Sequence, residues 1–418
     1  MKNRLIHLFV TIVAGVFLVA CSGGTSSPNY TVGGTISGLT SGSLVLKNNG
    51  GDALTISANS AAFTFATALA SGSSYAVTVG TQPSGLTCSV TNGSGTVASA
   101  NITNITLVCR TQIAYVTNVV GNTISMYAIN ASTGILTPLS TPTVATGSGP
   151  QYITTNSTGT YAYVLNGNSN TISMYAINAS TGILTPLSTP TVVTGSSPSS
   201  IAINSAGTIA YVSNNGDNTI GVYAINASTG NLTQISTITL GNSPNNIVIN
   251  AAGTLAYVTN GDYISIISLA SNAVISSLPV NTGSAPQYIT MNSTGTYAYV
   301  ANGSSNTISM YAINASTGAL TLVNAGTVAT GRYPTKVAIN PAGTFAYVAN
   351  DSSNTISMYA INASTGILTP LSTPTITTGN APQYITMNSA GTAVYVANYS
   401  DNSISMYAIM RVLEYLHP

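Results

Sequence analysis

The sequence predicts an all-β protein that is mostly a seven-bladed β-propeller with a truncated last blade, preceded by a small β-sandwich module. Charged residues make up only 3% of the 418 residues, against about 25% in an ordinary soluble domain, whereas strand-forming Val, Ile, Thr and Tyr are abundant. Short stretches of alternating apolar and polar residues are separated by turn residues such as Asn and Gly. From Ile113 onward one sequence unit recurs seven times, with a repeat length typical of a propeller blade.

Residues 1–20 have the pattern of a lipoprotein signal peptide. A positively charged start is followed by an apolar stretch, which ends in Leu-Val-Ala-Cys at residues 18–21. This ending resembles the lipobox of bacterial lipoproteins, in which the cysteine becomes the lipid-modified first residue after cleavage. An ordinary signal peptide with a chance cysteine is the alternative. We expect an exported protein with a lipid on Cys21, a tether over residues 21–29, and the outer membrane or cell surface as its location.

Residues 30–110 are predicted to form the small β-sandwich module, because about seven short strand patterns occur there between turn signals. The segment resembles the Ig-like modules that precede propellers in secreted bacterial proteins, a likeness that implies no activity. Cys88 and Cys109 lie in a segment expected to be exported to an oxidising compartment, so we predict a disulfide between them. Two free thiols are the alternative.

The repeats over residues 111–410 carry the prediction of a propeller. The marker Tyr-Val-x-Asn, or a close variant of it, recurs at intervals of 42 to 48 residues, beginning at Tyr115, Tyr163, Tyr211, Tyr257, Tyr299, Tyr347 and Tyr395. Each complete unit contains four strand patterns, which is the content of one propeller blade. The fourth pattern carries proline at Pro138, Pro186 and Pro370, which is tolerated at a sheet edge, so it is expected to be outermost. The first pattern, such as residues 151–156, is then innermost and lines the central channel.

Both ends of the repeat region depart from the pattern. Ile113 begins its unit at the second strand, so the first blade needs an inner strand from elsewhere. After Ile409 the expected turn and outer strand are replaced by an aberrant tail over residues 411–418. The strand that normally closes a propeller is therefore predicted to be missing.

The repeats resemble the YVTN-type β-propeller proteins and, more distantly, the seven-bladed lactonase-like (6-phosphogluconolactonase-like) propellers. The residues that carry this resemblance are the Tyr-Val-Thr-Asn motifs at 115–118 and 257–260, together with the recurring Asn-Thr-Ile-Ser-Met-Tyr and Ser-Thr-Gly segments. The resemblance covers residues 113–409. It implies a seven-bladed fold, and it transfers no catalytic residue to this chain.

The repeats contain few side chains that could take part in catalysis or bind a metal ion. Between Gln112 and Ile409 the sequence contains no His, Glu or Cys, which excludes a His-dependent catalytic triad and a His/Cys zinc site there. We predict no metal site and no cofactor. The four aspartates of this region follow the second strands, where turn chemistry explains them. After signal-peptide cleavage the formal net charge is −1, which argues against nucleic acid as a partner.

Arg332 and Lys336 are the two cations of the repeats, and both lie close to the start of an inner strand. They form a candidate anion-contacting pair at the mouth of the channel, with ordinary surface variation as the alternative. The near-identical blades and the scarcity of ionisable groups favour a surface-anchored, non-enzymatic propeller that binds a protein or a glycan. A lactonase-like hydrolase is the alternative function.

Overall fold

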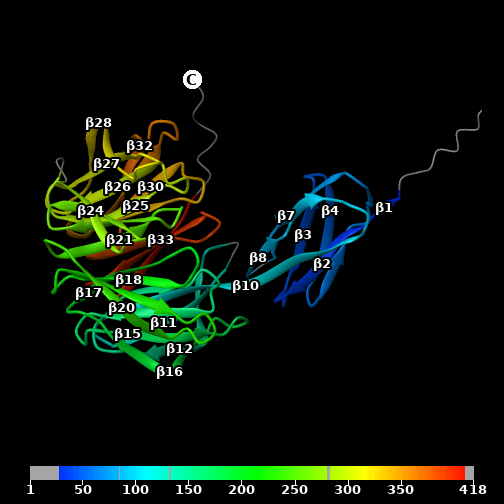
Figure 1. The fold of residues 1–418 in the computed structure, drawn as a ribbon, viewed down its shortest axis with the longest axis horizontal. Coiled ribbons are helices and arrows are strands. Elements are labelled where there is room, and N and C mark those ends of the chain that lie inside the picture. The colour runs from blue at the N-terminus through cyan, green and yellow to red at the C-terminus, as the bar shows by residue number, and fades with distance from the viewer. Residues whose placement is uncertain (1–27, 84, 131–132, 280–282, 410–418) are drawn as a thin grey trace, which may run out of the picture.

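The structure of the protein is a computed structural model that describes residues 28–409 except 84, 131–132 and 280–282. Within these residues it is all-β apart from one 3-10 turn, η1 (Asp351–Ser353), and it confirms the predicted propeller (Figure 1). The signal peptide, Cys21, most of the tether and the aberrant tail lie outside the described residues. Within the described part, no helix has the length and hydropathy of a membrane span.

Five sheets of the propeller, numbered 2 to 6, are complete. Each contains four antiparallel strands that pair in chain order, from an inner strand to an outer strand. Sheet 2 consists of β13 (Pro150–Thr155), β14 (Tyr161–Asn166), β15 (Thr171–Ile177) and β16 (Leu184–Val193). Sheets 3 and 4 consist of β17 (Pro198–Ile203), β18 (Ile209–Asn214), β19 (Thr219–Ile225), β20 (Leu232–Thr239), β21 (Pro244–Ile249), β22 (Leu255–Asn260), β23 (Tyr263–Ser268) and β24 (Ala273–Pro279). Sheets 5 and 6 consist of β25 (Pro286–Met291), β26 (Tyr297–Asn302), β27 (Thr307–Ile313), β28 (Leu320–Ala329), β29 (Pro334–Ile339), β30 (Phe345–Asn350), β31 (Thr355–Ile361) and β32 (Leu368–Thr377).

The repeated turn between the inner and second strands explains why this sequence forms these hairpins. Gly159 has a φ of 63°, which a residue with a Cβ rarely adopts. The side-chain oxygen of Asn156 accepts hydrogen bonds from the backbone of Thr160 and Tyr161, at 2.9 and 3.0 Å. Glycine and asparagine at fixed positions therefore close this turn in sheets 2 to 7, as the sequence pattern predicted.

Tyrosine hydroxyl groups join neighbouring sheets. In the second strand, Tyr163 donates to the carbonyl of Gly230, which precedes the outer strand of the next sheet, at 2.9 Å. In the third strand, Tyr223 donates to the carbonyl of Val193 on the preceding outer strand, at 3.1 Å. These rings are buried, and each hydroxyl has a backbone partner. The recurring tyrosines therefore pack between sheets.

Sheets 1 and 7 are incomplete in complementary ways. Sheet 1 consists of the end of β10 (Ile102–Asn118) with β11 (Thr123–Ile129) and β12 (Leu136–Ala145), and it has no inner strand among the described residues. Sheet 7 consists of β33 (Pro382–Met387), β34 (Ala393–Asn398) and β35 (Ser403–Ala408), and it has no outer strand among them. We call the junction of these two sheets the seam.

The ring nevertheless closes at the seam. Tyr395 of sheet 7 donates to the carbonyl of Gly134 in sheet 1 at 2.7 Å. This is the same contact that Tyr163 makes with Gly230 between two complete sheets. Ile129, Ala393 and Tyr395 form a small buried cluster there. The two incomplete sheets therefore sit as neighbours, as complete ones do.

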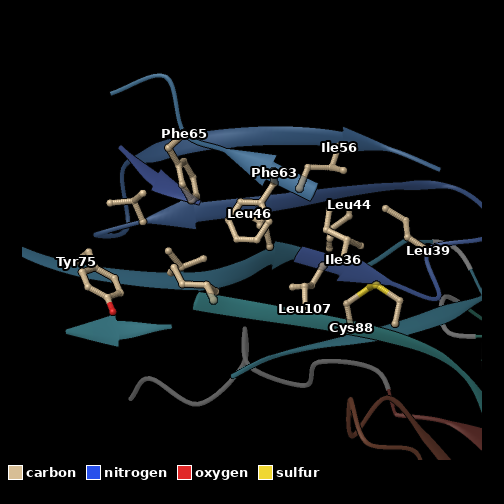
Figure 2. Close-up of a cluster of buried hydrophobic side chains, with 14 of the residues drawn as sticks. Ile36, Leu39, Leu44, Leu46, Ile56, Phe63, Phe65, Tyr75, Cys88 and Leu107 are labelled. Carbon is tan, nitrogen blue, oxygen red and sulfur yellow. A yellow bond between two sulfur atoms is a disulfide. The ribbon is translucent and has the colours of Figure 1, made fainter. Parts of the chain in front are cut away.

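In the N-terminal module, a four-stranded sheet packs against strands that extend sheet 1 beyond the propeller, around one apolar core (Figure 2), and a short two-stranded sheet lies beside them. Its strands are β1 (Asn29–Tyr30), β2 (Val32–Ser37), β3 (Ser43–Asn48), β4 (Asp52–Ser57), β5 (Ala62–Thr64), β6 (Leu69–Ala70), β7 (Ser74–Thr81), β8 (Leu86–Thr91) and β9 (Ser94–Thr96), together with the first part of β10. Leu44 and Leu46 of one sheet face Leu107 of the other, and all three are fully buried. The Ig-like likeness of this module stays a prediction.

Strand β10 belongs to both parts of the molecule. Its first part pairs with β2 in parallel and with β8 in antiparallel orientation, and its last seven residues pair with β11 of the propeller. Gly34 of β2 lies so close to β10 that a Cβ there would come within 1.9 Å of the Ile105 carbonyl oxygen, so glycine is needed at this position. The expected boundary at residues 110–111 thus falls inside one continuous strand (Figure 1).

Candidate ligand-binding site at the channel mouth and seam

One end of the propeller sheets carries two sets of loops that are bonded to each other. One set joins each outer strand to the next inner strand, and the other joins second and third strands. The N–H of Gly167 donates to the carbonyl of Gly149 at 2.8 Å, and the N–H of Asp351 donates to the carbonyl of Tyr333 at 2.9 Å. We call this end of the channel the mouth.

Three tyrosines at the mouth are exposed to solvent. Tyr263 begins β23 directly after a mouth hairpin, Tyr333 precedes β29, and Tyr399 follows β34; their side chains are 40%, 39% and 49% exposed. Elsewhere in the repeats tyrosine is mostly a packing residue, so its exposure here needs another reason. Exposed aromatic rings with a polar hydroxyl are typical of surfaces that bind other molecules.

The centre of the channel is filled by the third residue of each inner strand. These residues are Tyr152, Ser200, Asn246, Tyr288, Lys336 and Tyr384. The rings of Tyr152 and Tyr384 meet edge to face with centroids 6.0 Å apart, and Asn246 donates to the hydroxyl of Ser200 at 3.0 Å. A register shift between the first and third residues of the inner strands recurs from sheet to sheet. We call Tyr152, Tyr288, Tyr384 and Lys336 the channel cluster.

Lys336 lies between the rings of the channel cluster. Its ammonium nitrogen is 2.9 Å from the ring centroid of Tyr384 and 5.1 Å from that of Tyr288, and the residue is 7% exposed. Burial places its pKa well below the ordinary value of 10.5, because a buried charge loses its hydration. Burial likewise raises the pKa values of Tyr152, Tyr288 and Tyr384, so the three phenols stay neutral at physiological pH.

The two cations predicted as an anion-contacting pair occupy different surroundings. Arg332 is exposed in a mouth loop, where its backbone N–H donates to the hydroxyl of Ser353 at 2.7 Å. Lys336 is buried in the channel cluster. Sequence reasoning placed both residues next to the inner strand. It did not identify the cluster, although the recurring Gln-Tyr-Ile-Thr segment of the inner strands was the signal for it.

The aspartates of the propeller stabilise mouth loops. Asp217 accepts a hydrogen bond from the backbone N–H of Ser196 at 2.6 Å, and Asp401 accepts one from that of Asn380 at 2.5 Å. These backbone bonds lower the pKa values of both carboxyl groups. Asp262 accepts from the N–H of Ala285 at 3.0 Å. These three aspartates lie in the hairpins where the sequence placed them, and their carboxylates bind the backbone of the neighbouring mouth loop.

A cavity of about 680 Å³ lies at the seam, between β10 of sheet 1 and the strands of sheet 7. The lining includes Thr117 and Asn118 from one side, Tyr384 and Tyr399 from the other, and Gln151 from sheet 2. All lining residues are uncharged. The cavity connects the mouth with the channel cluster through Tyr384.

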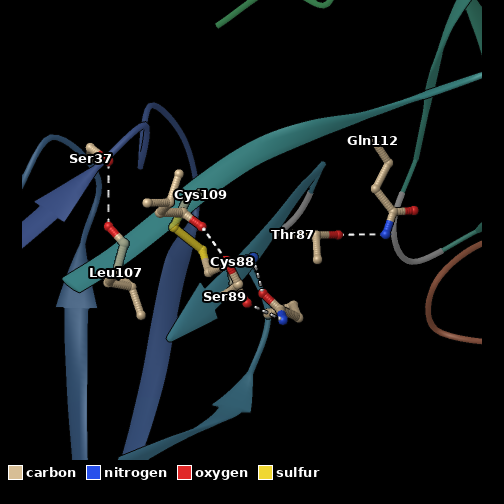
Figure 3. Close-up of a disulfide and its surroundings, with 9 residues drawn as sticks. Ser37, Thr87, Cys88, Ser89, Leu107, Cys109 and Gln112 are labelled. Atoms are coloured by element: carbon tan, nitrogen blue, oxygen red, sulfur yellow. Dashed lines mark hydrogen bonds between the residues drawn. A yellow bond between two sulfur atoms is a disulfide. The ribbon is translucent and has the colours of Figure 1, made fainter. Parts of the chain in front are cut away.

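The structure contains the predicted disulfide between Cys88 and Cys109, which joins the paired strands β8 and β10 of the N-terminal module (Figure 3). The side chain of Gln82 forms two hydrogen bonds with the backbone of Cys88. Its oxygen accepts from the Cys88 N–H at 2.7 Å, and its nitrogen donates to the Cys88 carbonyl at 3.0 Å. Within the described part of the chain, His, Cys, Asp and Glu residues do not gather in a group that could hold a metal ion.

The sheets, their register and their closed ring define a seven-bladed β-propeller. The sequence model of the family "Lactonase, 7-bladed beta-propeller" matches residues 105–273 and 265–376, which is more than half of the chain. The protein belongs to this family, as the resemblance of the repeats indicated. Among curated proteins, none matches significantly.

Solved structures show the same fold at low sequence identity. A candidate 6-phosphogluconolactonase from Bacteroides uniformis is 20% identical, with a TM-score of 0.61 over 69% of this chain and 88% of its own. The periplasmic gluconolactonase of Pseudomonas aeruginosa is 17% identical, with a TM-score of 0.59 over 68% and 87%. The hydrazine synthase of Kuenenia stuttgartiensis is 18% identical, with a TM-score of 0.56 over 71% and 92%. The fold is therefore shared by proteins with unrelated activities.

Proposed function

We propose that this protein is an exported, lipid-anchored propeller that binds a protein or a glycan at its mouth without chemical turnover. The observation that carries this proposal is the composition of the mouth and the seam cavity. Tyr399 lines the seam cavity among amides, hydroxyls and aromatic rings, and Tyr263 and Tyr333 are exposed elsewhere at the mouth. Such groups recognise sugars and polypeptides by stacking and neutral hydrogen bonds.

The positions of the charged groups support a binding role. Hydrolysis of a lactone needs a base, a nucleophile or a metal next to the substrate. Here Asp217, Asp262 and Asp401 hold backbone amides of mouth loops, and the lining of the seam cavity is uncharged. The module and its disulfide would act as a stalk between the anchor and the propeller.

One observation favours lactone hydrolysis as a second candidate. Lys336 has a strongly lowered pKa, and a neutral lysine in an aromatic site can act as a base or a nucleophile. It reaches the seam cavity only through the ring of Tyr384, which covers it at 2.9 Å. The names of the Bacteroides and Pseudomonas neighbours point to the same substrate class.

A binding assay and a turnover assay on the same full-length protein separate the two functions. The first applies the protein to an array of immobilised glycans and to isolated cell-wall sacculi. Binding is expected to fall in the double variant Tyr333→Ala/Tyr399→Ala and to persist in Ile235→Ala, which changes an exposed residue in the outer strand β20. The second assay follows acid release from glucono-1,5-lactone, with a rate expected to equal that of buffer. Turnover that is lost in Lys336→Met would overturn the proposal in favour of hydrolysis.

A further inference from the structure

The outer strand of each complete sheet has one partner strand among the described residues, and most of these outer edges are shaped so that a further strand cannot pair with them. In sheet 2, the ladder between β15 and β16 is interrupted where Met174 faces four residues of β16, at 187–190. Pro186 and Pro190 lie at this interruption, and neither has an N–H to donate. Bulges and prolines are the usual protection of an exposed sheet edge. The outer strands of sheets 1 and 6 have the same sequence pattern, with prolines at Pro138, Pro142, Pro370 and Pro374.

The outer strand of sheet 3, β20, lacks this protection. Its ladder with β19 is interrupted by one additional residue, Ile235, and no proline occurs in Leu232–Thr239. The side chain of Ile235 is 54% exposed, although isoleucine is normally a core residue. Sheet 4 also has a one-residue interruption, but β24 ends in Pro279, which has no N–H, and sheet 5 has the longer interruption of sheet 2. Among the complete sheets, sheet 3 therefore has the most regular unprotected outer edge.

The hydrogen bonds between sheets single out the same strand. Near the end of an outer strand, a carbonyl group accepts a hydrogen bond from a tyrosine of the next sheet, as Val193 does from the hydroxyl of Tyr223 at 3.1 Å. The carbonyl groups of Ala145, Ala329 and Thr377 accept in the same way from Tyr175, Tyr359 and Tyr407. In β20 the equivalent carbonyl is that of Thr239, and the third strand of sheet 4 has Ile267 in place of the tyrosine. The end of β20 thus keeps an acceptor that these other outer strands have used.

The pairing of β20 with β19 determines which of its backbone groups face outward. The N–H of Leu240 donates to the carbonyl of Asn218 at 2.8 Å, so Leu240 faces β19. Because successive residues of an antiparallel strand alternate, Thr239 and Thr237 direct their N–H and C=O groups away from β19. No other strand pairs with β20 among the described residues. These two threonines therefore offer two donors and two acceptors to an additional strand.

We propose that β20 pairs with β20 of a second copy of this chain, in antiparallel orientation about a twofold axis, so that the two four-stranded sheets become one continuous sheet. In this register Thr237 lies opposite the partner's Thr239, and Ile238 lies on the axis. The threonine pairs exchange backbone hydrogen bonds, in which the Thr239 carbonyl finds its missing donor. This inference goes beyond the proposed function and does not depend on it. It places two mouths in one assembly, which raises the affinity for a repeated ligand.

Charge and symmetry select a second copy as the occupant of this edge. Residues 231–240 contain no charged side chain, and the formal net charge of the whole chain is +1, so two copies do not repel each other strongly. An antiparallel pair of identical strands is self-complementary, because each contact occurs twice about the axis. Threonines opposite each other on neighbouring strands are also a favourable pair. Figure 1 shows β20 on the side of the propeller away from the N-terminal module, so the module leaves this part of the rim accessible.

Sedimentation velocity of the full-length protein over a range of concentrations tests the proposal, in excess detergent that keeps lipid-anchored chains in separate micelles. The wild type is expected to show a concentration-dependent equilibrium between monomer and dimer. Thr237→Pro removes an outward donor and keeps the bonds to β19, so it is expected to raise the dissociation constant of the dimer roughly tenfold or more. Thr375→Pro is the matched control, because Thr375 holds the equivalent outward position in β32 of sheet 6. Its dissociation constant should stay close to that of the wild type.

A second pair of variants decides the question if a proline variant fails to fold, as judged by circular dichroism. Thr237→Lys retains the N–H and places two like charges beside the axis, so it should weaken the dimer, whereas Thr375→Lys should not. The proposal is wrong if the wild type is monomeric at every concentration, or if the dimer persists unchanged in the Thr237 variants that fold. It is also wrong if the Thr375 variants weaken the dimer as much as the Thr237 variants do.

Discussion

The complete sheets and the seam contain the same sequence in different surroundings. The segment Ser-Met-Tyr-Ala occurs in β15 at residues 173–176 and in β35 at residues 405–408. Met174 is 1% exposed, whereas Met406 is 48% exposed, because sheet 7 has no outer strand among the described residues. The contribution of a repeat to stability is therefore set by its neighbours as well as by its own residues, as expected for an array of repeated units.

The largest predicted difference between the two regions is at these methionines. Met174→Ala removes a buried side chain that also accepts a contact from the Leu232 N–H, and it should cost about 2–5 kcal/mol of unfolding free energy. Met406→Ala changes a half-exposed side chain and should stay within about 0.5 kcal/mol of wild type. Urea denaturation followed by circular dichroism measures both. Equal losses would mean that Met406 is covered in solution and that the seam is filled.

A second prediction concerns Lys336. It belongs to the complete sheet 6, and its ammonium group lies against the ring of Tyr384 in sheet 7, at the seam. Its pKa is lowered in the folded state, so between that pKa and 10.5 the unfolded chain binds more protons than the folded one. Stability should therefore rise with pH in this window and fall as the pH is lowered through it, by about 1.4 kcal/mol per pH unit.

The variant Lys336→Met should lose this pH dependence and be more stable than wild type near neutral pH. Urea midpoints at several pH values from about 7 to about 9.5, below the ordinary pKa of tyrosine near 10, test this expectation. Lys47→Met, in the N-terminal module, is the matched control and should retain the wild-type slope. A slope that persists in Lys336→Met would show that another group controls it.

The smallest predicted effect distinguishes closure at the seam from contacts between complete sheets. Tyr395→Phe removes the hydroxyl that bonds Gly134 across the seam, and Tyr163→Phe removes the equivalent bond to Gly230. Each should cost about 1 kcal/mol of stability. Hydrogen exchange should show loss of protection confined to β33–β35 and β10–β12 for Tyr395→Phe. If both variants lower protection equally around the ring, the seam is no weaker than the other junctions.

The repeats made most of the propeller predictable. The spacing of Tyr-Val-x-Asn identified seven sheets, and proline located the outer strand, where Pro186 pairs opposite Tyr175 at the sheet edge. The recurring glycine and asparagine residues predicted where the hairpins turn, because the backbone conformation of a tight turn depends on the residues within it. The incomplete state of sheets 1 and 7 among the described residues was also predictable, since it followed from counting strand patterns at both ends of the repeats.

The candidate site was predicted only in part, because it depends on contacts between blades. Lys336 lies 48 residues from both Tyr288 and Tyr384 in sequence, and only the closed ring brings the three side chains together. Arg332, four residues from Lys336, lies in the mouth instead. Likewise, the lack of an inner strand in sheet 1 among the described residues was inferable, whereas the meeting of Tyr152 and Tyr384 required the packed structure.

The continuity of β10 has a mechanical consequence. A tension applied between the N-terminal end of the module and the propeller would be carried along this 17-residue strand and its parallel neighbour β2. Parallel strands pulled from opposite ends are loaded in shear, so their hydrogen bonds must fail together instead of opening one at a time. The disulfide between β8 and β10 adds a covalent link beside that ladder. If the protein is tethered through its N-terminus, this ladder of bonds would oppose separation of the propeller from the module under load.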